Sequence, residues 1–291
     1  MWRSDGEPPR MSEEEFRLLR ELVHAHCGIH FRDDTRYLLE RRLAPRLEAN
    51  GLATFGAYHR FLRFDPGRAA ELQRAIDLLT TNETYFYREP YQLDAFAREI
   101  LPALARTRTA ERSLRILSAG CSTGEEAYSL AVLVKDSHLF EGWSIEIVGC
   151  DISERCVAQA RAGVYGEHAF RNAEAEPMRR WFHLRGGKWS VDEAIRRLVR
   201  FSHENLLDPR ALSTISRLDV LVCRNVMIYF DVEARRQLLR MFHAKLRGGG
   251  WLLLGHSESL INLTADFEMV HLETDLVYRK PQRAGAEEAW P

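Results

Sequence analysis

The sequence predicts a doubly wound α/β fold with an antiparallel edge, preceded by a small all-α domain. From residue 114 onward, short apolar runs alternate with amphipathic helical stretches, which is typical of a parallel sheet built from strand-helix-strand units. Residues 11–75 show helical periodicity and no strand pattern. Near the C-terminus, apolar runs at 267–272 and 276–279 flank a polar turn and predict a closing antiparallel hairpin.

The N-terminal part of the chain is predicted to be a group of helices. Ser12 and Glu15 have the spacing of a capping box, and apolar residues follow at helical intervals, so the first helix should begin near Ser12. It should end near Gly28. Further helices are expected over 34–49, 55–63 and 69–79. We therefore place a helical domain at 11–75 and a second domain at 76–281.

The elements of the second domain follow from its alternating pattern. Buried strands are expected at 114–119, 145–150, 220–223 and 251–255, and helices at 125–135, 154–162 and 232–246. Gly248, Gly249 and Gly250 are expected to end the last helix and turn the chain into its strand. Residues 164–201 break the alternation, and a Gly186-Gly187 turn within them predicts a small hairpin-bearing insertion.

Composition and charge exclude several classes of protein. The 291 residues are 45% apolar and 29% charged, as in ordinary globular proteins, and 41 basic residues balance 42 acidic ones, which gives no general attraction for nucleic acid. No apolar run approaches the roughly 20 residues that cross a bilayer, and the first ten residues are too polar for a secretory signal. The five cysteines are scattered without Cys-x-x-Cys spacing. We therefore expect a cytoplasmic protein with no membrane insertion, no disulfide framework and no metal site.

A glycine-rich turn joins the first predicted strand to the helix that follows it. It runs from Gly120 to Gly124 and would let backbone N–H groups approach a ligand closely, although such a pair of glycines is equally typical of a tight turn without a ligand. The next predicted strand ends at Asp151, where an acidic residue in such folds accepts hydrogen bonds from a ribose. Glu125 and Glu126 would repel a pyrophosphate, so the charges favour S-adenosylmethionine, which carries a sulfonium, over NAD.

Two further polar segments are candidates for the same site. Residues 223–230 follow a predicted parallel strand, at the sheet edge where open α/β sheets bind ligands. A capping loop with one buried tyrosine is the alternative interpretation. Residues 79–89 combine hydroxyl, amide, aromatic and guanidinium groups, which is too polar for a core helix and too aromatic for a linker. A solvated loop is the alternative there.

Five motifs together resemble the chemotaxis receptor methyltransferase family, CheR. In chain order they are TTNETYFYRE at 80–89, AGCSTGEEAYS at 119–129, GCDIS at 149–153, CRNVMIYFD at 223–231 and GHSES at 255–259. The likeness covers about residues 11–280. It implies a Rossmann-like class I S-adenosylmethionine-dependent methyltransferase sheet, a helical N-terminal domain and a small inserted β-subdomain. It also implies methyl esterification of glutamate side chains on the cytoplasmic helices of methyl-accepting chemoreceptors.

The same resemblance implies a site for the methyl donor and the substrate. Its expected members are Asn82, Thr84, Arg88, Gly120, Glu125, Asp151, Asn205, Leu206, Arg224, Asn225 and Tyr229. Glu125 is expected to reach the donor and Asp151 to hold its ribose. Asn205 and Leu206 are expected to border the adenine. Ser122 stands where many methyltransferases have a glycine, a departure that this family tolerates.

Arg88 and Tyr229 are the expected catalytic residues. A glutamate carboxylate is ionised near pH 7, since its ordinary pKa is about 4.3, so no general base is required. The planar guanidinium of Arg88 can grip a carboxylate while leaving an oxygen lone pair free, and Tyr229 can add a hydrogen bond. Arg224 and Asn225 should complete the pocket beneath Tyr229. No catalytic histidine is needed, so His256 is expected to be structural or superficial.

A cluster of basic residues in the N-terminal domain is the candidate receptor surface. Its members are Arg32, Arg36, Arg41, Arg42 and Arg46. Several lie at helical spacing and could meet acidic receptor helices, while a solvated basic face paired with Glu40 and Glu48 explains the cluster equally well. In some family members the β-subdomain captures a tethering peptide at the receptor C-terminus. The turn at 185–188 is short for that task, so we expect a protein that works without the tether.

Two other functions fit a donor-binding α/β domain. The first is methylation of a small molecule or of RNA, although the balanced charge and the lack of interleaved basic and aromatic patches argue against RNA. The second is a donor-binding signalling scaffold without activity.

Overall fold

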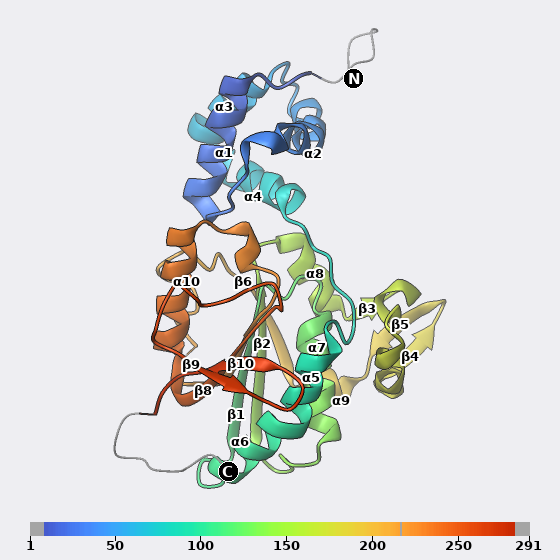
Figure 1. Cartoon of the computed structure of the whole chain (residues 1–291). Coiled ribbons are helices and arrows are strands. Elements are labelled where there is room, and N and C mark those ends of the chain that lie inside the picture. The colour runs from blue at the N-terminus through green and yellow to red at the C-terminus, as the bar shows by residue number, and fades with distance from the viewer. Residues whose placement is uncertain (1–8, 216, 283–291) are drawn as a thin grey trace.

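A helical N-terminal domain lies against one end of an α/β domain, and a small sheet projects from the side of the α/β domain (Figure 1). The computed structural model describes residues 9–215 and 217–282. The N-terminal helices are α1 (Glu13–Cys27), α2 (Arg36–Ala49), α3 (Phe55–Phe64) and α4 (Arg68–Leu79), with a 3-10 turn, η1 (Asp33–Thr35), before α2. The all-α character predicted from periodicity is confirmed.

Helix α1 shows how local sequence sets both ends of a helix. Ser12 Oγ accepts the N–H of Glu15 at 3.2 Å, and the Glu15 carboxylate accepts the N–H of Ser12 at 2.9 Å, which is the predicted capping box. The helix stops at Gly28, whose φ is 71° and whose Cβ, if present, would lie 2.1 Å from Leu207 Cδ1. Glycine is therefore required where α1 meets the α/β domain.

The central sheet of the α/β domain has the strand order β6-β2-β1-β7-β8-β10-β9. Its strands are β1 (Ser113–Ala119), β2 (Ser144–Asp151), β6 (Val199–His203), β7 (Leu218–Cys223), β8 (Leu246–Leu254), β9 (Glu268–His271) and β10 (Leu276–Arg279). β6, β2, β1, β7 and β8 run parallel, and β10 is antiparallel to both β8 and β9. The strand order reverses between β1 and β7, which is the point where open α/β sheets bind ligands. The doubly wound sheet with an antiparallel edge is confirmed.

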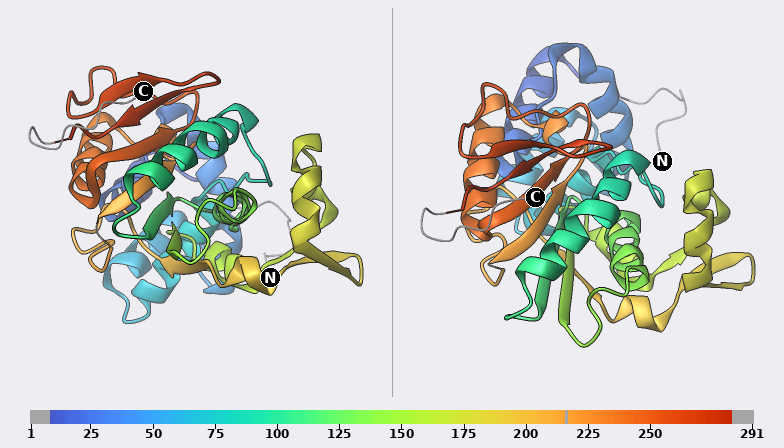
Figure 2. Two further views of the ribbon diagram at one scale, coloured as in Figure 1. Left: turned by 90° about the horizontal axis from the view of Figure 1, so that it is seen from below. Right: turned by 60° about the horizontal axis from the view of Figure 1, so that its bottom comes forward.

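Helices cover both faces of this sheet (Figure 2). On one face lie α7 (Glu125–Asp136) and a continuous helical stretch of α5 (Pro90–Ala95), the π-helical turn η2 (Phe96–Ile100) and α6 (Leu101–Thr107). α8 (Glu154–Ala162) packs beside α7, where the Tyr128 hydroxyl donates to the Ala160 carbonyl at 3.0 Å. α10 (Val232–Lys245) packs on the other face, and its buried residues share one core with those of the N-terminal helices. Alternate strand residues belong to the two cores: Val222 of β7 lies in the core that includes α7, and its neighbour Leu221 lies in the core that includes α10.

Three features of the fold differ from the sequence prediction. β6 pairs with β2, so residues 199–201 belong to the main sheet and not to the insertion; as an edge strand with mixed burial, β6 lacks a continuous apolar run. The helical stretch over residues 90–107 was not predicted. Gly248, Gly249 and Gly250 do not form the expected turn, because α10 ends at Lys245 and the glycines lie within β8 at a register shift. Such a bulge accommodates Gly249, whose φ is 74°.

The insertion forms the projecting small sheet, which we call the β-subdomain (residues 164–198). It contains β3 (Val164–Tyr165), η3 (Glu167–Phe170), η4 (Ala173–Trp181), β4 (Phe182–Arg185), β5 (Lys188–Val191) and α9 (Glu193–Arg196). The sheet order is β3-β5-β4, with antiparallel pairing. Gly186 and Gly187, with φ of 56° and 74°, make the two-residue turn between β4 and β5. The predicted hairpin is confirmed.

Membrane-spanning and metal-binding features were sought over the described residues. No helix there is both long and apolar enough to cross a bilayer. The same residues contain no group of three or more His, Cys, Asp or Glu side chains arranged to hold a metal ion. The five cysteines are free and buried.

Candidate functional site

A cavity of about 560 Å³ lies where the parallel strands end, between the α/β domain and the N-terminal domain. The loops that follow β1, β2, β6 and β7 form its floor, and the segment 79–88 forms one side. The chain from Cys27 to Arg42 closes the other side. The volume is in the range of small-molecule sites in proteins, and the position is the ligand-binding edge of an open α/β sheet.

Ten of the eleven site residues expected from the sequence line this cavity. They are Asn82, Thr84, Arg88, Gly120, Asp151, Asn205, Leu206, Arg224, Asn225 and Tyr229. Glu125 does not: its side chain is buried beside Thr123, whose hydroxyl donates to it at 2.7 Å, and burial raises its pKa. Glu126 lines the cavity instead. Successive side chains on a helix of about 3.6 residues per turn point in different directions, and here the one at Glu126 borders the cavity.

The glycine-rich turn after β1 is bound to the end of β2. The N–H groups of Gly120 and Cys121 both donate to the Cys150 carbonyl, at 2.8 and 2.9 Å. Gly120 has a φ of 77°, and a Cβ on it would lie 2.3 Å from Val226 Cγ2. The absence of a side chain thus lets the turns after β1 and β7 approach each other at the floor of the cavity.

Asp151 presents a buried carboxylate at the end of β2. It is 7% exposed, and its two oxygens accept the N–H groups of Ser122 and Ser153, each at 2.8 Å. Burial raises the pKa of Asp151, and these two hydrogen bonds oppose the shift. Each oxygen keeps a further lone pair, so the carboxylate can also accept hydrogen bonds from hydroxyl groups of a ligand.

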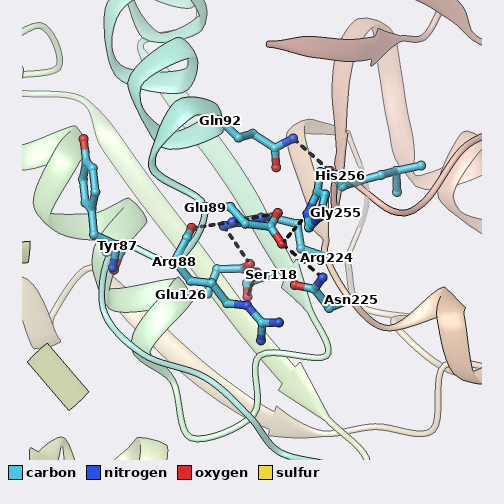
Figure 3. A network of polar contacts seen from close by, with 12 residues as sticks. Tyr87, Arg88, Glu89, Gln92, Ser118, Glu126, Arg224, Asn225, Gly255 and His256 are labelled. Carbon is cyan, nitrogen blue, oxygen red and sulfur yellow. Dashed lines mark hydrogen bonds and ion pairs between the residues drawn. The ribbon is translucent and has the colours of Figure 1, made fainter. Parts of the chain in front are cut away.

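Arg224 is the centre of a buried charge network (Figure 3). Its side chain is 2% exposed and contacts Glu89 at 3.2 Å, Glu126 at 3.4 Å and the backbone carbonyl of Arg88. Ser118 Oγ donates to Glu126 at 2.7 Å. Burial raises the pKa of Glu126 although the Arg224 guanidinium opposes that shift.

Glu89 connects this network to the loops after β7 and β8. Burial alone would raise the pKa of Glu89, but the Arg224 charge and hydrogen bonds from Asn225 and His256 outweigh it, so the pKa is lowered. Asn225 Nδ2 donates to Glu89 at 3.1 Å, and His256 Nδ1 lies 3.1 Å from the same oxygen. The His256 side chain is 79% exposed and does not line the cavity, in keeping with the expected superficial role.

The Arg88 guanidinium makes no hydrogen bond or ion pair with the Arg224 network in the described part of the chain, but it lies on the Glu126 side of that network (Figure 3), and its charge opposes the rise in the pKa of Glu126. It donates to the Glu83 carbonyl and lies 5.9 Å from the centroid of the Tyr85 ring. In the described part of the chain it forms no ion pair with a carboxylate. Its charge at the cavity wall is therefore available to an anionic ligand.

The N-terminal domain contributes a wall that the sequence did not reveal. His30 N–H donates to the Tyr229 carbonyl at 2.8 Å, Ile29 forms a bridge with Phe230, and Asn205 Nδ2 donates to the His26 carbonyl at 2.6 Å. These contacts hold two predicted site residues, Tyr229 and Asn205, against a segment distant in sequence. Such pairings leave no local sequence signal.

The predicted cluster of five arginines is divided in the structure. Arg46 donates two hydrogen bonds to the buried Glu71, at 2.8 and 2.6 Å, and Arg42 donates to the Leu79 carbonyl and to Thr81. These two side chains hold α2 against α4 and the segment that follows it. Arg32, Arg36 and Arg41 are exposed. The expectation of one continuous surface of five arginines is therefore corrected to these three.

Comparison with known proteins identifies both domains. Residues 14–80 match the model of the CheR methyltransferase all-alpha domain, and residues 82–276 match that of the CheR methyltransferase SAM binding domain. The chain is 34% identical over 280 residues to chemotaxis protein methyltransferase 2 of Vibrio cholerae, covering 96% of each chain. It is 35% identical over 273 residues to chemotaxis protein methyltransferase 1 of Pseudomonas aeruginosa, covering 91% of this chain and 97% of that one.

Among solved structures, magnesium protoporphyrin IX methyltransferase from Synechocystis with bound SAM is 15% identical, covers 77% of this chain and 89% of its own, and has a TM-score of 0.36. That likeness is too distant to add to the assignment. The two family models span most of the chain, and the relatives above 30% identity span nearly all of it. The chain belongs to the CheR methyltransferase family and is an S-adenosylmethionine-dependent methyltransferase.

Proposed function

We propose that this protein transfers a methyl group from S-adenosylmethionine to glutamate side chains on the cytoplasmic helices of chemoreceptors. The observation that carries the proposal is the presence of both charges in one cavity. Asp151, Glu126 and Glu204 line it, and so does Arg88, which forms no ion pair in the described part of the chain. A cationic donor suits these carboxylates, and an anionic acceptor suits the Arg88 guanidinium.

The residues present fit S-adenosylmethionine. Asp151 has carboxylate lone pairs for ribose hydroxyls, and Gly120 lines the same cavity. Glu126 offers a carboxylate to the cationic part of the donor, and Asn205 with Leu206 offers a mixed polar and apolar wall for the adenine. When bound, the donor supplies a methyl group on a positively charged sulfur.

The chain itself then has to position an acceptor. A glutamate carboxylate is already ionised, so no residue has to remove a proton. Arg88 can hold one carboxylate oxygen through its fork of N–H groups and leave the other oxygen free to react. Tyr229 lines the same cavity and can add a hydrogen bond that orients the acceptor. Alignment of this kind contributes about 7 to 11 kcal/mol to the lowering of a barrier.

The receptor surface that we propose consists of Arg32, Arg36 and Arg41. All three are exposed, and Arg32 also borders the cavity, so this surface leads directly to the site. The relatives named chemotaxis protein methyltransferases support chemoreceptors as the partner. Activity on receptor cytoplasmic helices implies a cytoplasmic location. We also propose that the division at 11–75 and 76–281 separates receptor recognition from chemistry, and that the short turn at 185–188 makes the protein independent of a tethering peptide.

One assay tests the proposed reaction. The full chain is incubated with methyl-labelled donor and a chemoreceptor cytoplasmic fragment, and the product is treated with base. Glutamyl methyl esters release labelled methanol. Label that survives base would indicate methylation of another acceptor, such as RNA or an amine. Donor binding in calorimetry without any incorporation would indicate a signalling scaffold, and either result overturns the proposal.

A further inference from the structure

The chain segment that presents Arg88 is held from outside the cavity by the β-subdomain. After α4 this segment runs past the β-subdomain before it enters α5 (Figure 1), and the two lie side by side in the further views as well (Figure 2). Each residue from Glu83 to Tyr87 contacts the β-subdomain. No sequence motif indicated this arrangement.

Arg171 of the β-subdomain makes three of these contacts with one guanidinium. Its Nη2 lies 2.6 Å from the Glu83 carboxylate, and its Nη1 donates to the Thr84 carbonyl at 3.4 Å. Its Cζ lies 3.9 Å from the centroid of the Tyr85 ring. The Arg171 side chain is 26% exposed and that of Glu83 is 67% exposed, so the ion pair itself lies at the surface. A planar guanidinium is the group that can stack on a ring and donate along its edge at the same time.

The rest of the segment is held by backbone bonds and aromatic packing. The Phe86 N–H donates to the Ala169 carbonyl at 2.9 Å, and Asn172 Nδ2 donates to the Tyr87 carbonyl at 2.8 Å. The Phe86 ring stacks on Phe170 with centroids 4.6 Å apart, and it is fully buried. Tyr87 has a φ of 59°, which is unfavourable for a non-glycine residue and persists only where surrounding contacts enforce it.

Tyr85 links the contacts between the β-subdomain and residues 83–87 to the site. Its ring receives the Arg171 guanidinium at 3.9 Å, and the Arg88 guanidinium lies 5.9 Å from the same centroid. Arg88 also donates to the carbonyl of Glu83, whose side chain pairs with Arg171. The groups that set the direction of Arg88 are thus the groups that Arg171 holds.

We propose that Arg171 is a positioning residue for methyl transfer, which holds Glu83 and Tyr85 so that Arg88 faces the acceptor carboxylate. This inference rests on the proposed function of Arg88. It gives the β-subdomain a part in the reaction that does not depend on capture of any peptide. A small displacement of Arg88 is sufficient to misalign the carboxylate, because transfer requires close alignment of the reacting atoms.

The test compares Arg171→Ala, Arg171→Lys and Arg179→Ala with the wild type. Arg179 is the matched control: it belongs to the same β-subdomain, pairs with Glu167 and lies over the rings of Phe170 and Trp189. Within the described residues it forms no hydrogen bond, ion pair or ring contact with 83–88. The substrate is a receptor fragment without a C-terminal tether sequence. The measurements are kcat, KM for receptor, donor affinity by calorimetry, thermal unfolding, and amide hydrogen exchange in the peptide covering 83–88.

For Arg171→Ala we expect kcat to fall about tenfold, with donor affinity and KM little changed, because alignment and not binding is lost. Exchange at the Phe86 amide should accelerate. Arg171→Lys keeps the charge near Glu83 but not the stacking, so it should recover part of the loss. Arg179→Ala should keep kcat and the exchange rates of 83–88, even where it lowers the unfolding temperature.

Equal losses of kcat in Arg171→Ala and Arg179→Ala would mean that the β-subdomain matters only for stability and would overturn the proposal. So would an unchanged kcat in Arg171→Ala. Failure of the proposed function is a separate outcome, because the wild type would then release no methanol from the receptor fragment.

Discussion

Two arginines of the site have opposite surroundings. Arg224 is buried between the carboxylates of Glu89 and Glu126. Its charge is therefore neutralised by these two ion pairs, which hold the loops together. Arg88 contacts a backbone carbonyl and an aromatic ring, and its charge remains available. A buried cation with two anionic partners is costly to disturb, whereas a wall-lining cation can exchange water for a ligand. Of these two arginines, Arg88 is therefore the one that suits the incoming carboxylate.

For the single residue Arg88, we expect Arg88→Ala to lower kcat for methyl transfer at least about tenfold, because the acceptor carboxylate loses the group that orients it. Donor affinity, measured by calorimetry, should survive. Arg185→Ala, at the exposed hairpin turn of the β-subdomain, is the control and should leave turnover unchanged. If Arg88→Ala turned over at the wild-type rate, Arg88 would have no part in the reaction.

At the scale of elements, the loops that form the floor of the cavity are bound to one another by backbone contacts. The Glu258 carboxylate accepts the N–H groups of Asn225 and Gly255, each at 2.8 Å, and that of Val226 at 3.0 Å. One side chain after β8 thus holds the loop after β7, which in turn packs on Gly120 after β1. The floor of the cavity is therefore a single connected unit.

Gly120→Ala should disturb this unit. Both Gly120 and Gly186 have positive φ, at 77° and 56°, but a Cβ at Gly120 would overlap Val226, whereas a Cβ at Gly186 meets nothing within 4 Å. We expect Gly186→Ala to show only the backbone cost, about 1 kcal/mol in the free energy of unfolding. Gly120→Ala should cost more and weaken donor binding, as denaturant unfolding and calorimetry would measure. Equal effects of the two variants would contradict the steric argument.

The N-terminal domain depends on one buried ion pair. Glu71 is 1% exposed and accepts hydrogen bonds from Arg46 and from the Tyr58 hydroxyl, the latter at 2.8 Å. Burial alone would raise the pKa of Glu71, but its bonds to Arg46 and Tyr58 outweigh this effect, so the pKa is lowered from 4.5. A carboxyl whose pKa is lowered in the folded state stabilises the fold at pH values above the pKa that the group has in the unfolded chain.

This contribution should be present above about pH 4.5 and disappear as the pH falls through the lowered pKa of Glu71. We expect Glu71→Gln to be less stable than the wild type at pH 7 and to show a flatter decline of unfolding free energy below pH 4.5. Denaturant unfolding at a series of pH values measures both. Glu268→Gln, on the exposed part of β9, is the control. An equally steep acid decline in Glu71→Gln would rule out this carboxyl as the cause.

For the whole molecule, the two domains enclose the cavity between them, and one of the three exposed arginines lines it. Arg32 belongs both to the cavity wall and to the exposed basic surface. A receptor helix bound along α2 would thus bring its glutamates toward Arg88. Attraction between exposed charges is screened by salt, so such a surface acts mainly on encounter and affinity.

Charge reversal at Arg36 and Arg41 should therefore raise KM for the receptor fragment, reduce the salt dependence of kcat/KM and leave kcat unchanged. Arg46 is unsuitable for this test, because its reversal would break the pair with Glu71. Arg106→Glu is the matched control, since α6 lies at the end of the molecule away from α2 (Figure 1). An unchanged salt profile in the double variant would indicate that these arginines are only a solvated face.

The sequence by itself determined the fold class and most of the residues that line the cavity. Apolar runs, the Ser12 capping box and the turn at Gly186 depend on neighbours along the chain, and the candidate site residues after β1, β2 and β7 follow from the ends of predicted strands. The tertiary structure decided the rest. The orientation of α7 places Glu126, and not Glu125, at the cavity. Arg46 points inward and pairs with Glu71, and Arg171 contacts the segment before Arg88. These outcomes depend on contacts between residues distant in sequence, and such contacts leave no periodic signal in the chain.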